Sequence, residues 1–257
     1  MKIVLIGAGN LSNHLGPILQ KNGHEVIEVV GRSEQHCIKL AKRLKCSYST
    51  EPASISGKAD VYLVAVPDTE IKNVAAFFPH KKKLIVHTSG SVPLNVFPKQ
   101  FENTGVLYPL QTFSRNQKLT NKNIPVCIEG NNRKSVLKLK KLGASISNHV
   151  TEIDSTQRLW LHLSAVIVNN FSNHLFALAE KITEEHGLDF DLLRPLIAET
   201  ASKVRNSSPA LAQTGPAKRG DTAIIEKHLQ LLLKNPKLKS IYALLSDSIE
   251  EMHGTKF

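Results

Sequence analysis

The chain opens with Met1-Lys2-Ile3-Val4-Leu5-Ile6-Gly7-Ala8-Gly9-Asn10-Leu11-Ser12, an apolar run that breaks into two glycines and then into a helical pattern. Gly7 permits a tight turn, Gly9 lets a phosphate approach the backbone, and the small Ser12 allows helix and strand to pack closely. A helix that begins near Asn10 directs its N–H groups and the positive end of its dipole at that phosphate. The stretch predicts a dinucleotide site on a Rossmann-type sheet.

The end of the second expected strand, residues 25–30, indicates which dinucleotide binds. NAD-specific sites place a carboxylate there, about 20 residues beyond the glycines, to accept a hydrogen bond from the ribose. This chain continues instead with Gly31, Arg32 and Ser33. Arg32 can stack on adenine or pair with a 2′-phosphate, and Ser33 can donate a hydrogen bond while it caps the next helix. The pattern favours NADP(H), the alternative being that Arg32 is a solvated turn residue.

Strand and helix patterns alternate through residues 1–153, which predicts an α/β domain with a doubly wound, mostly parallel sheet. The segments expected after Ser33 are helix 35–44, strand 47–49, strand 61–66, a helix that includes 71–78, strand 84–91, a strand pattern 105–109 with 111–113, strand 124–130, helix 135–142 with its stop at Gly143, and a last strand near 145–150. In such sheets ligands bind beyond the carboxyl ends of the strands, so the residues that follow the strands are candidates for the site.

Polar residues follow two of these strands. Val66, Pro67 and Asp68 should border the cofactor, although helix capping is the favoured interpretation of Asp68. The next strand ends in the residues His87, Thr88, Ser89 and Gly90. Thr88 and Ser89 are predicted to contact the cofactor, and Ser89 and Gly90 also the substrate. His87 is a candidate catalytic residue, although a satisfied histidine at the strand end is slightly favoured.

From Asp154 the pattern consists of helices alone, which predicts a second, all-α domain over residues 154–257. Asp154 or Ser155 caps a long helix over about 157–186. At about 100° per residue, one face of this helix carries His162, Val166, Asn169 and Asn173, with Asn170 slightly off it. Such polar groups need a polar partner when buried. Substrate and nicotinamide are the favoured partners, and another helix is the alternative.

Further helices are expected over 192–204, 222–234 and 238–253. The loop before the second of them contains Arg219 and Asp221, and His228 lies on the same face seven residues beyond Asp221. These three residues are candidate substrate contacts. Capping alone explains Asp221, whereas a guanidinium on a loop shaped by Gly and Pro can either bind an anionic ligand or tie the loop down.

Composition limits the function classes. The net charge of +11 favours anionic ligands, but the lysines are scattered and accompany no base-reading motif, so nucleic acid is not an expected partner. The three cysteines, Cys37, Cys46 and Cys127, form no paired motif, which predicts a reducing cytoplasm and no metal site. No apolar run reaches the ~18 residues of a membrane span, so no membrane association is expected. The helical half alone is not expected to close its core, which predicts a homodimer through that half.

Several motifs in order resemble one bacterial family of NADP-dependent oxidoreductases that join a Rossmann-like domain to a helical domain of unknown function. The motifs are 7–11, 31–33, 65–68, 87–90, Tyr108-Pro109-Leu110-Gln111-Thr112-Phe113, the helix of 162–170, and 214–221. More distant similarity runs to pyrroline-5-carboxylate reductase, deazaflavin-dependent NADP reductase and the β-hydroxyacid dehydrogenases. This resemblance implies NADP(H), a small-molecule substrate and a helical domain like the C-terminal domain of 6-phosphogluconate dehydrogenase.

One departure from the β-hydroxyacid dehydrogenases affects the expected chemistry. Those enzymes carry a lysine four residues before an asparagine on the first helix of the second domain, whereas this chain has Ala165 before Asn169 and Val166 before Asn170. His162 is the expected substitute for proton transfer, because imidazole titrates near working pH. Asn169 or Asn170 would orient the substrate. The sequence thus predicts hydride transfer between NADPH and a small anionic carbonyl or imine compound, the alternative being a non-catalytic NADP-binding sensor or assembly protein.

Overall fold

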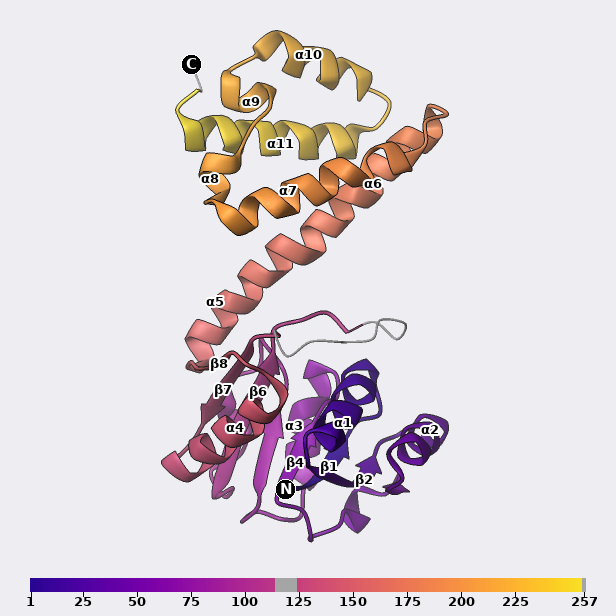
Figure 1. The fold of residues 1–257 in the computed structure, drawn as a ribbon, viewed down its shortest axis with the longest axis vertical. Helices are drawn as coiled ribbons and strands as arrows, with labels where there is room; N and C mark the ends of the chain where they lie inside the picture. The colour runs from indigo at the N-terminus through magenta and orange to yellow at the C-terminus, as the bar shows by residue number, and fades with distance from the viewer. Residues whose placement is uncertain (114–123, 256–257) are drawn as a thin grey trace. The chain divides into compact units, whose positions relative to one another are not determined.

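The computed structural model describes residues 1–113 and 124–255. The chain forms two compact units, Met1–Val168 and Asn169–Phe257 (Figure 1). The boundary predicted between residues 153 and 154 lies at the start of helix α5 (Ser155–Ala165), whose first turns are bonded to the first unit.

The first unit is built on an eight-stranded sheet with the order β3-β2-β1-β4-β5-β6-β7-β8. The strands are β1 (Lys2–Ile6), β2 (Glu25–Val30), β3 (Ser47–Ser49), β4 (Val61–Val64), β5 (Leu84–His87), β6 (Asn103–Pro109), β7 (Val126–Gly130) and β8 (Val150–Glu152). Every neighbouring pair is parallel except β6 and β7, which run antiparallel. The order confirms the predicted Rossmann-type fold, and β1 lies between β2 and β4 as a dinucleotide site requires.

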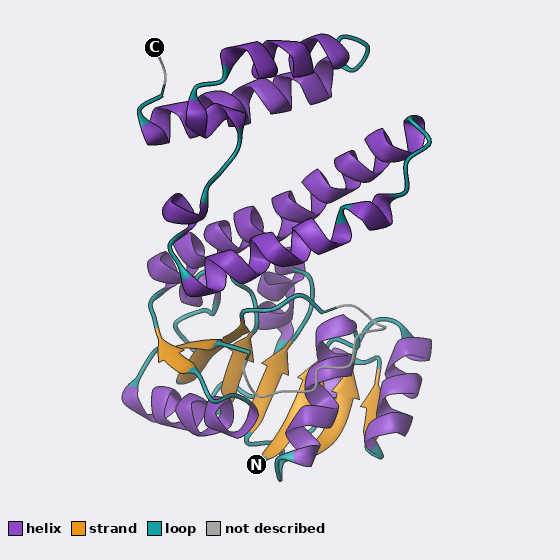
Figure 2. Cartoon of the chain, turned by 45° about the horizontal axis from the view of Figure 1, so that its top comes forward, coloured by secondary structure: helices purple, strands orange, loops and turns teal. Residues whose placement is uncertain are grey.

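Helices cover both faces of this sheet (Figure 2). The helices of the first unit up to the last strand are α1 (Asn10–Lys21), α2 (Glu34–Leu44), α3 (Asp68–Phe77) and α4 (Arg133–Ile146), with short 3₁₀ turns η1 (Pro52–Ser54) and η2 (Leu94–Val96). One core packs α1, α2 and α4 on the sheet, and a second core packs α3 on the opposite face. Both faces of the central strands are therefore buried, which explains their continuous apolar sequences.

Two sequence predictions in this unit are wrong. Helix α4 does not stop at Gly143 but continues to Ile146, so the last strand begins at Val150 rather than near Ser145. Gly143 is buried inside the helix, where a Cβ would lie 3.0 Å from the Cγ1 of Val150. This glycine therefore allows close helix-to-strand packing instead of ending the helix. The strand pattern expected to include 111–113 is also shorter in the structure, because β6 ends at Pro109 and the Gln111 N–H turns back to the Pro109 carbonyl at 2.9 Å.

The remaining helices follow the last strand. They are α5 (Ser155–Ala165), the π-helical segment η3 (Val166–Phe171), α6 (Ser172–Glu185), the 3₁₀ turn η4 (Phe190–Leu192), α7 (Arg194–Asn206), α8 (Pro209–Ala212), α9 (Pro216–Arg219), α10 (Thr222–Leu231) and α11 (Pro236–His253). The carboxylate of Asp154 accepts from the Gln157 N–H at 2.8 Å, and the Gln157 side chain accepts from the Asp154 N–H. This capping box confirms Asp154, rather than Ser155, as the cap.

The π-helical segment changes the predicted arrangement of side chains on this long helix. A π-helix bonds residues five apart, so it turns by less per residue than an α-helix. The common face predicted for His162, Asn169 and Asn173 assumed a uniform 100° spacing, from which η3 departs. Within the described part of the chain, no helix is both long enough and apolar enough to cross a membrane.

Candidate cofactor and active site

The loop between β1 and α1 has the geometry of a phosphate cradle. Gly7 has a φ of 109°, and a Cβ on it would lie 2.2 Å from the carbonyl oxygen of Ala65, so only glycine fits. The Gly7 N–H donates to the carbonyl of Val30 at 2.7 Å, which holds the turn against β2. Gly9 is the N-cap of α1 without a side-chain cap, and its Cβ would meet no described atom within 4 Å. The helix N-terminus therefore has room for an anion.

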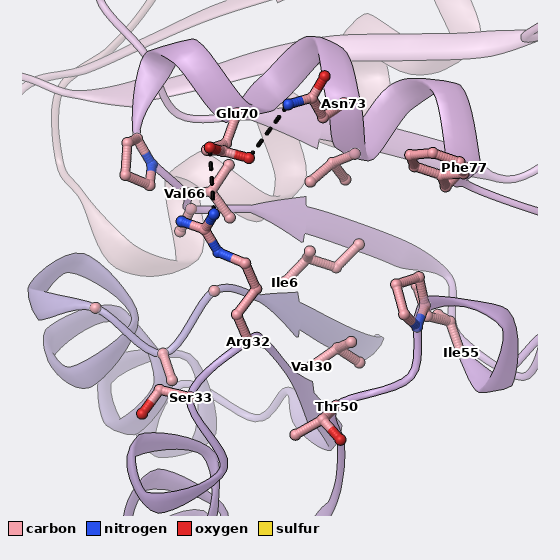
Figure 3. A pocket seen from close by; sticks show the side chains of 18 of the residues that line it. Ile6, Val30, Arg32, Ser33, Thr50, Ile55, Val66, Glu70, Asn73 and Phe77 are labelled. Atoms are coloured by element: carbon pink, nitrogen blue, oxygen red, sulfur yellow. Dashed lines mark hydrogen bonds and ion pairs between the residues drawn. The ribbon is translucent and has the colours of Figure 1, made fainter.

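A cavity of about 550 Å³ opens beside this cradle, at the carboxyl ends of β1, β2 and β4 (Figure 3). The predicted cofactor residues that line it are Gly7, Ala8, Gly9, Arg32, Ser33, Val66 and Pro67. Its lining residues do not include the other predicted cofactor residues, Asn10, Leu11, Asp68, Thr88 and Ser89. Apolar side chains such as Ile6, Val30 and Ile55 form its walls.

Arg32 and Ser33 lie at one edge of this cavity, at the junction of β2 and α2. The guanidinium Nη1 of Arg32 lies 3.3 Å from the Glu70 carboxylate, and the Arg32 side chain is 79% exposed. Ser33 is the N-cap of α2, as predicted, but its hydroxyl makes no capping hydrogen bond. Both polar groups can therefore turn toward a ligand without breaking a buried contact.

Sequence reasoning missed other residues that line the cavity. Those with polar or aromatic side chains include His36, Thr50, Glu70, Asn73 and Phe77. Three of them have helical spacing on α3, with Asn73 and Phe77 three and seven residues beyond Glu70, so periodicity identifies the face that they share. Nothing local in the sequence shows that this face of α3 lies opposite the end of β2, because that depends on the order of the strands.

The end of β5 is a compact polar network. The ring of His87 is fully buried, and its Nδ1 accepts from the Ser89 N–H at 3.2 Å. Its Nε2 has no hydrogen-bond partner among the described residues. Burial, followed by the charge of Arg158, lowers the pKa of His87 to about 3. This imidazole is neutral at working pH, which suits a structural histidine better than a proton carrier.

Neighbouring hydroxyl groups order the loop that follows β5. The Oγ of Ser89 accepts from the N–H groups of Ser91 and Val92, and the Ser91 hydroxyl donates to the Asp68 carboxylate at 2.5 Å. Asp68 is the first residue of α3, whose N-cap is Pro67, so the capping role favoured for Asp68 is wrong. The Thr88 hydroxyl donates to the carbonyl of Val64 at 3.2 Å. The predicted cofactor residues of this loop therefore also hold its conformation.

The structure brings Tyr108 to the predicted proton carrier. The hydroxyl of Tyr108, on β6, lies 3.1 Å from Nδ1 of His162 on α5, and the two rings are nearly perpendicular. Gly90 lies against both, since a Cβ on it would be 2.7 Å from His162 Nδ1 and 2.8 Å from Tyr108 Cζ. Both rings are half-buried, and burial raises the pKa of Tyr108. A phenol, an imidazole and a strand-end glycine thus meet in one place.

Helix α5 is fixed by a buried cation one turn before His162. Arg158, 1% exposed, forms an ion pair with Glu129 of β7 and donates to the carbonyl of Val92 at 2.6 Å. Ser155 accepts from the Leu94 N–H at 2.9 Å. No motif in the sequence indicates this pairing, because Glu129 and Arg158 are brought together only by the sheet.

The other predicted site residues belong to the second unit. Asn169 donates to the side-chain oxygen of Asn170 at 3.3 Å, and both are exposed, as is Asn173. Asp221 caps α10 through the Ile224 N–H at 3.3 Å and lies 3.9 Å from Arg219. His228 pairs with the Tyr242 hydroxyl of α11 at 2.8 Å. Asp221 and His228, both predicted substrate contacts, thus make hydrogen bonds to other residues of the second unit.

The residues of the first unit fit NADP(H). The cradle leaves space for a diphosphate at a helix N-terminus, the cavity has apolar walls for a base, and Arg32 with Ser33 supplies a cation and a hydroxyl at its edge. The cavity volume lies within the range of small-molecule sites, about 300–1,000 Å³.

Comparisons with known proteins agree with this geometry. Residues 2–90 match the family described as NADP oxidoreductase coenzyme F420-dependent, and residues 124–249 match a domain of unknown function, DUF2520. A candidate NADP oxidoreductase of Bacteroides fragilis is 39% identical, with a TM-score of 0.88, over 97% of this chain and 98% of its own. No curated protein matches the chain.

Two other solved structures show the same fold at lower identity. A Thermotoga maritima protein is 24% identical, with a TM-score of 0.76, over 98% of each chain. A 1-pyrroline-5-carboxylate reductase of Streptococcus pyogenes is 15% identical, with a TM-score of 0.66, also over 98% of each chain. With its two matched domains in order, the chain belongs to the family of NADP(H)-binding oxidoreductases in which a Rossmann-type domain precedes a DUF2520 domain.

Proposed function

We propose that the protein transfers a hydride between NADPH and a small anionic carbonyl or imine compound, with Tyr108 and His162 handling the proton. The observation that carries this proposal is the 3.1 Å contact between the Tyr108 hydroxyl and His162 Nδ1 beside Gly90. In Rossmann-type enzymes the reacting end of the cofactor lies beyond the carboxyl ends of the strands, where β5 ends at His87. The pair supplies the acid–base group that a lysine supplies in the β-hydroxyacid dehydrogenases.

The proton follows a short path in this proposal. NADPH, held by the glycine cradle and Arg32, would supply a hydride to the electrophilic carbon and become NADP⁺, while the π electrons of the C=O or C=N bond move to the oxygen or nitrogen. The Tyr108 hydroxyl gives its proton to the oxygen or nitrogen that gains the electron pair. Nδ1 of His162 returns a proton to the phenolate, and solvent restores the proton to the half-buried ring. A phenol holds its proton at neutral pH until the substrate takes it, and burial, which raises the pKa of Tyr108, acts in the same direction.

The chemistry of the chain also supports an anionic substrate. The net charge is +11, which favours anionic ligands. The reductase likeness at 15% identity concerns the fold alone, so the substrate class rests on this charge and on the Tyr108–His162 pair.

The test measures the oxidation of NADPH by its absorbance, with small 2-oxo acids, aldehydes, cyclic imino acids and flavins offered as acceptors. For any acceptor that is reduced, Tyr108→Phe should lower kcat by about 10²–10⁴ and leave the Kd of NADPH from calorimetry unchanged. His162→Asn should also lower kcat. Tyr48→Phe, on an exposed tyrosine of β3, is the matched control. Wild-type turnover in both site variants would contradict the proposal, and an absence of NADPH oxidation with every acceptor would favour the sensor hypothesis.

We further propose that the protein works as a homodimer through its second unit. Among the described residues 169–255, only Ala217 and Ser246 are buried. Large apolar side chains such as Phe171, Leu196 and Leu231 are 57–75% exposed. A chain of this length normally buries a core of its own, so a second copy is the expected cover.

A further inference from the structure

A carboxylate occupies the side of the cavity that faces Arg32. Oε1 of Glu70, in the first turn of α3, lies 3.3 Å from the guanidinium Nη1 of Arg32 (Figure 3). Its second oxygen accepts from the side-chain amide of Asn73 at 3.3 Å. The Glu70 side chain is 30% exposed, compared with 79% for Arg32. The carboxylate is therefore the better-held partner, and the arginine is the mobile one.

The ion pair joins two elements on opposite sides of the same cavity. Arg32 follows β2, near Ser33 and His36, whereas Glu70 and Asn73 belong to α3, and all five residues line the cavity. The Arg32 side therefore offers a cation, a hydroxyl and an imidazole. The α3 side offers a negative charge, which repels a phosphate placed near Arg32.

We propose that Glu70 competes with the ribose 2′-phosphate for Arg32 and thereby limits how strongly the protein prefers NADP(H) over NAD(H). The proposal rests on the assignment of Arg32 to the 2′-phosphate. Arg32 must leave the Glu70 carboxylate to bind that phosphate, and the phosphate then lies near an uncompensated negative charge. A nucleotide without the phosphate leaves the ion pair intact. Only the binding of NADP(H) therefore carries the free-energy cost of breaking the ion pair.

The charge difference sets the direction of the exchange. A phosphate monoester carries about −1.5 to −2 charges at pH 7, compared with −1 for the carboxylate, and it can accept two parallel hydrogen bonds from one guanidinium. The phosphate therefore displaces Glu70, but with reduced affinity. An ion pair this exposed contributes about 0–1 kcal/mol, which converts to at most about a fivefold change in the dissociation constant.

The test measures Kd by calorimetry on the full chain for NADPH and NADH, and for adenosine 2′,5′-bisphosphate and 5′-AMP as probes of this end of the site. Glu70→Gln keeps the size of the side chain and removes its charge. It should lower the Kd of the two 2′-phosphorylated ligands by about two- to fivefold and leave the other two unchanged. Added salt should reduce the difference, because the charges are exposed. Glu25→Gln, at the far end of β2, is the control for net charge.

Arg32→Ala separates this inference from the cofactor assignment on which it depends. In the Arg32→Ala background there is no ion pair to lose, so adding Glu70→Gln should no longer lower the Kd of NADPH in that way. The effects of the two substitutions on this Kd should therefore not be additive. If Arg32→Ala weakens NADPH but Glu70→Gln leaves it unchanged or weakens it, the competition is overturned and the assignment stands. If Arg32→Ala leaves both NADPH and adenosine 2′,5′-bisphosphate unchanged, the assignment fails, and the proposal fails with it.

Discussion

Arg158 and Glu129 form an ion pair that joins helix α5 to strand β7, with side chains only 1% and 15% exposed. The guanidinium also donates to the carbonyl of Val92, so one side chain holds the helix, the sheet and the loop after β5 together. Its Nε has no partner among the described residues. Because His162 lies one turn beyond Arg158, this anchor sets the distance from His162 to Tyr108.

Removal of the Glu129 charge should therefore destabilise the first unit. Glu129→Gln leaves a buried guanidinium without its counter-charge, and we expect a loss of about 3 kcal/mol in the free energy of unfolding by urea. Glu152→Gln is the control, because Glu152 lies on the adjacent strand β8 and is paired with Lys140 of α4, but is 48% exposed. Its expected loss is below about 1 kcal/mol. Equal losses in the two variants would show that burial of the Glu129 pair has no energetic consequence.

Stability should fall in acid because of His87. Its pKa is about 3 in the folded protein, against an ordinary value of 6.5. Between these two pH values the unfolded chain binds a proton that the folded chain does not, so stability falls as pH falls from about 6.5 toward 3, by up to about 1.4 kcal/mol per pH unit. His87→Asn, which keeps an acceptor for the Ser89 N–H, should flatten this dependence in urea titrations between pH 7 and 4.5.

The control for this effect is His186→Asn, since His186 is exposed. That variant should keep the pH slope of the wild type. A wild-type slope in His87→Asn would mean that another group causes the loss of stability in acid.

The two glycines of the cradle should respond differently to alanine. Gly7→Ala places a Cβ 2.2 Å from the Ala65 carbonyl oxygen at a φ of 109°, so the free energy of unfolding should fall by about 2 kcal/mol or more. Gly9→Ala meets no described atom within 4 Å and should leave stability within about 0.5 kcal/mol of the wild type. Its methyl group would occupy the space expected for the diphosphate, so NADPH should bind roughly tenfold more weakly. If Gly9→Ala binds NADPH as tightly as the wild type does, the diphosphate does not lie against Gly9.

The dimer has a direct test in sedimentation velocity. The wild type should sediment as a dimer at micromolar concentration, and Phe171→Glu should yield monomer, because it places a charge on the expected interface. Leu137→Glu is the matched control, since Leu137 is also 57% exposed but lies on α4 of the first unit. A monomeric wild type would contradict the homodimer, and dissociation by Leu137→Glu would place the interface on the first unit.

Local sequence was sufficient for the elements near the chain's first residues. The apolar run of β1, the two glycines and the first turn of α1 are contiguous, so spacing alone identified the cradle and the fold class. The positions of Arg32 and Ser33 beside the cavity followed in the same way, because the end of β2 lies next to the end of β1 in every sheet of this type. Gly143 was misinterpreted because its close contact with Val150 is not a local property.

The tertiary structure decided which distant groups meet. Glu70 lies opposite Arg32, Tyr108 beside His162, and Glu129 beside Arg158, in each case across many residues of sequence. These pairs depend on strand order, on the antiparallel β7 and on the anchoring of α5, none of which leaves a periodic signal. Periodicity reports the face of an element that a residue occupies, whereas the charge or hydroxyl that it meets there is set by how the elements pack.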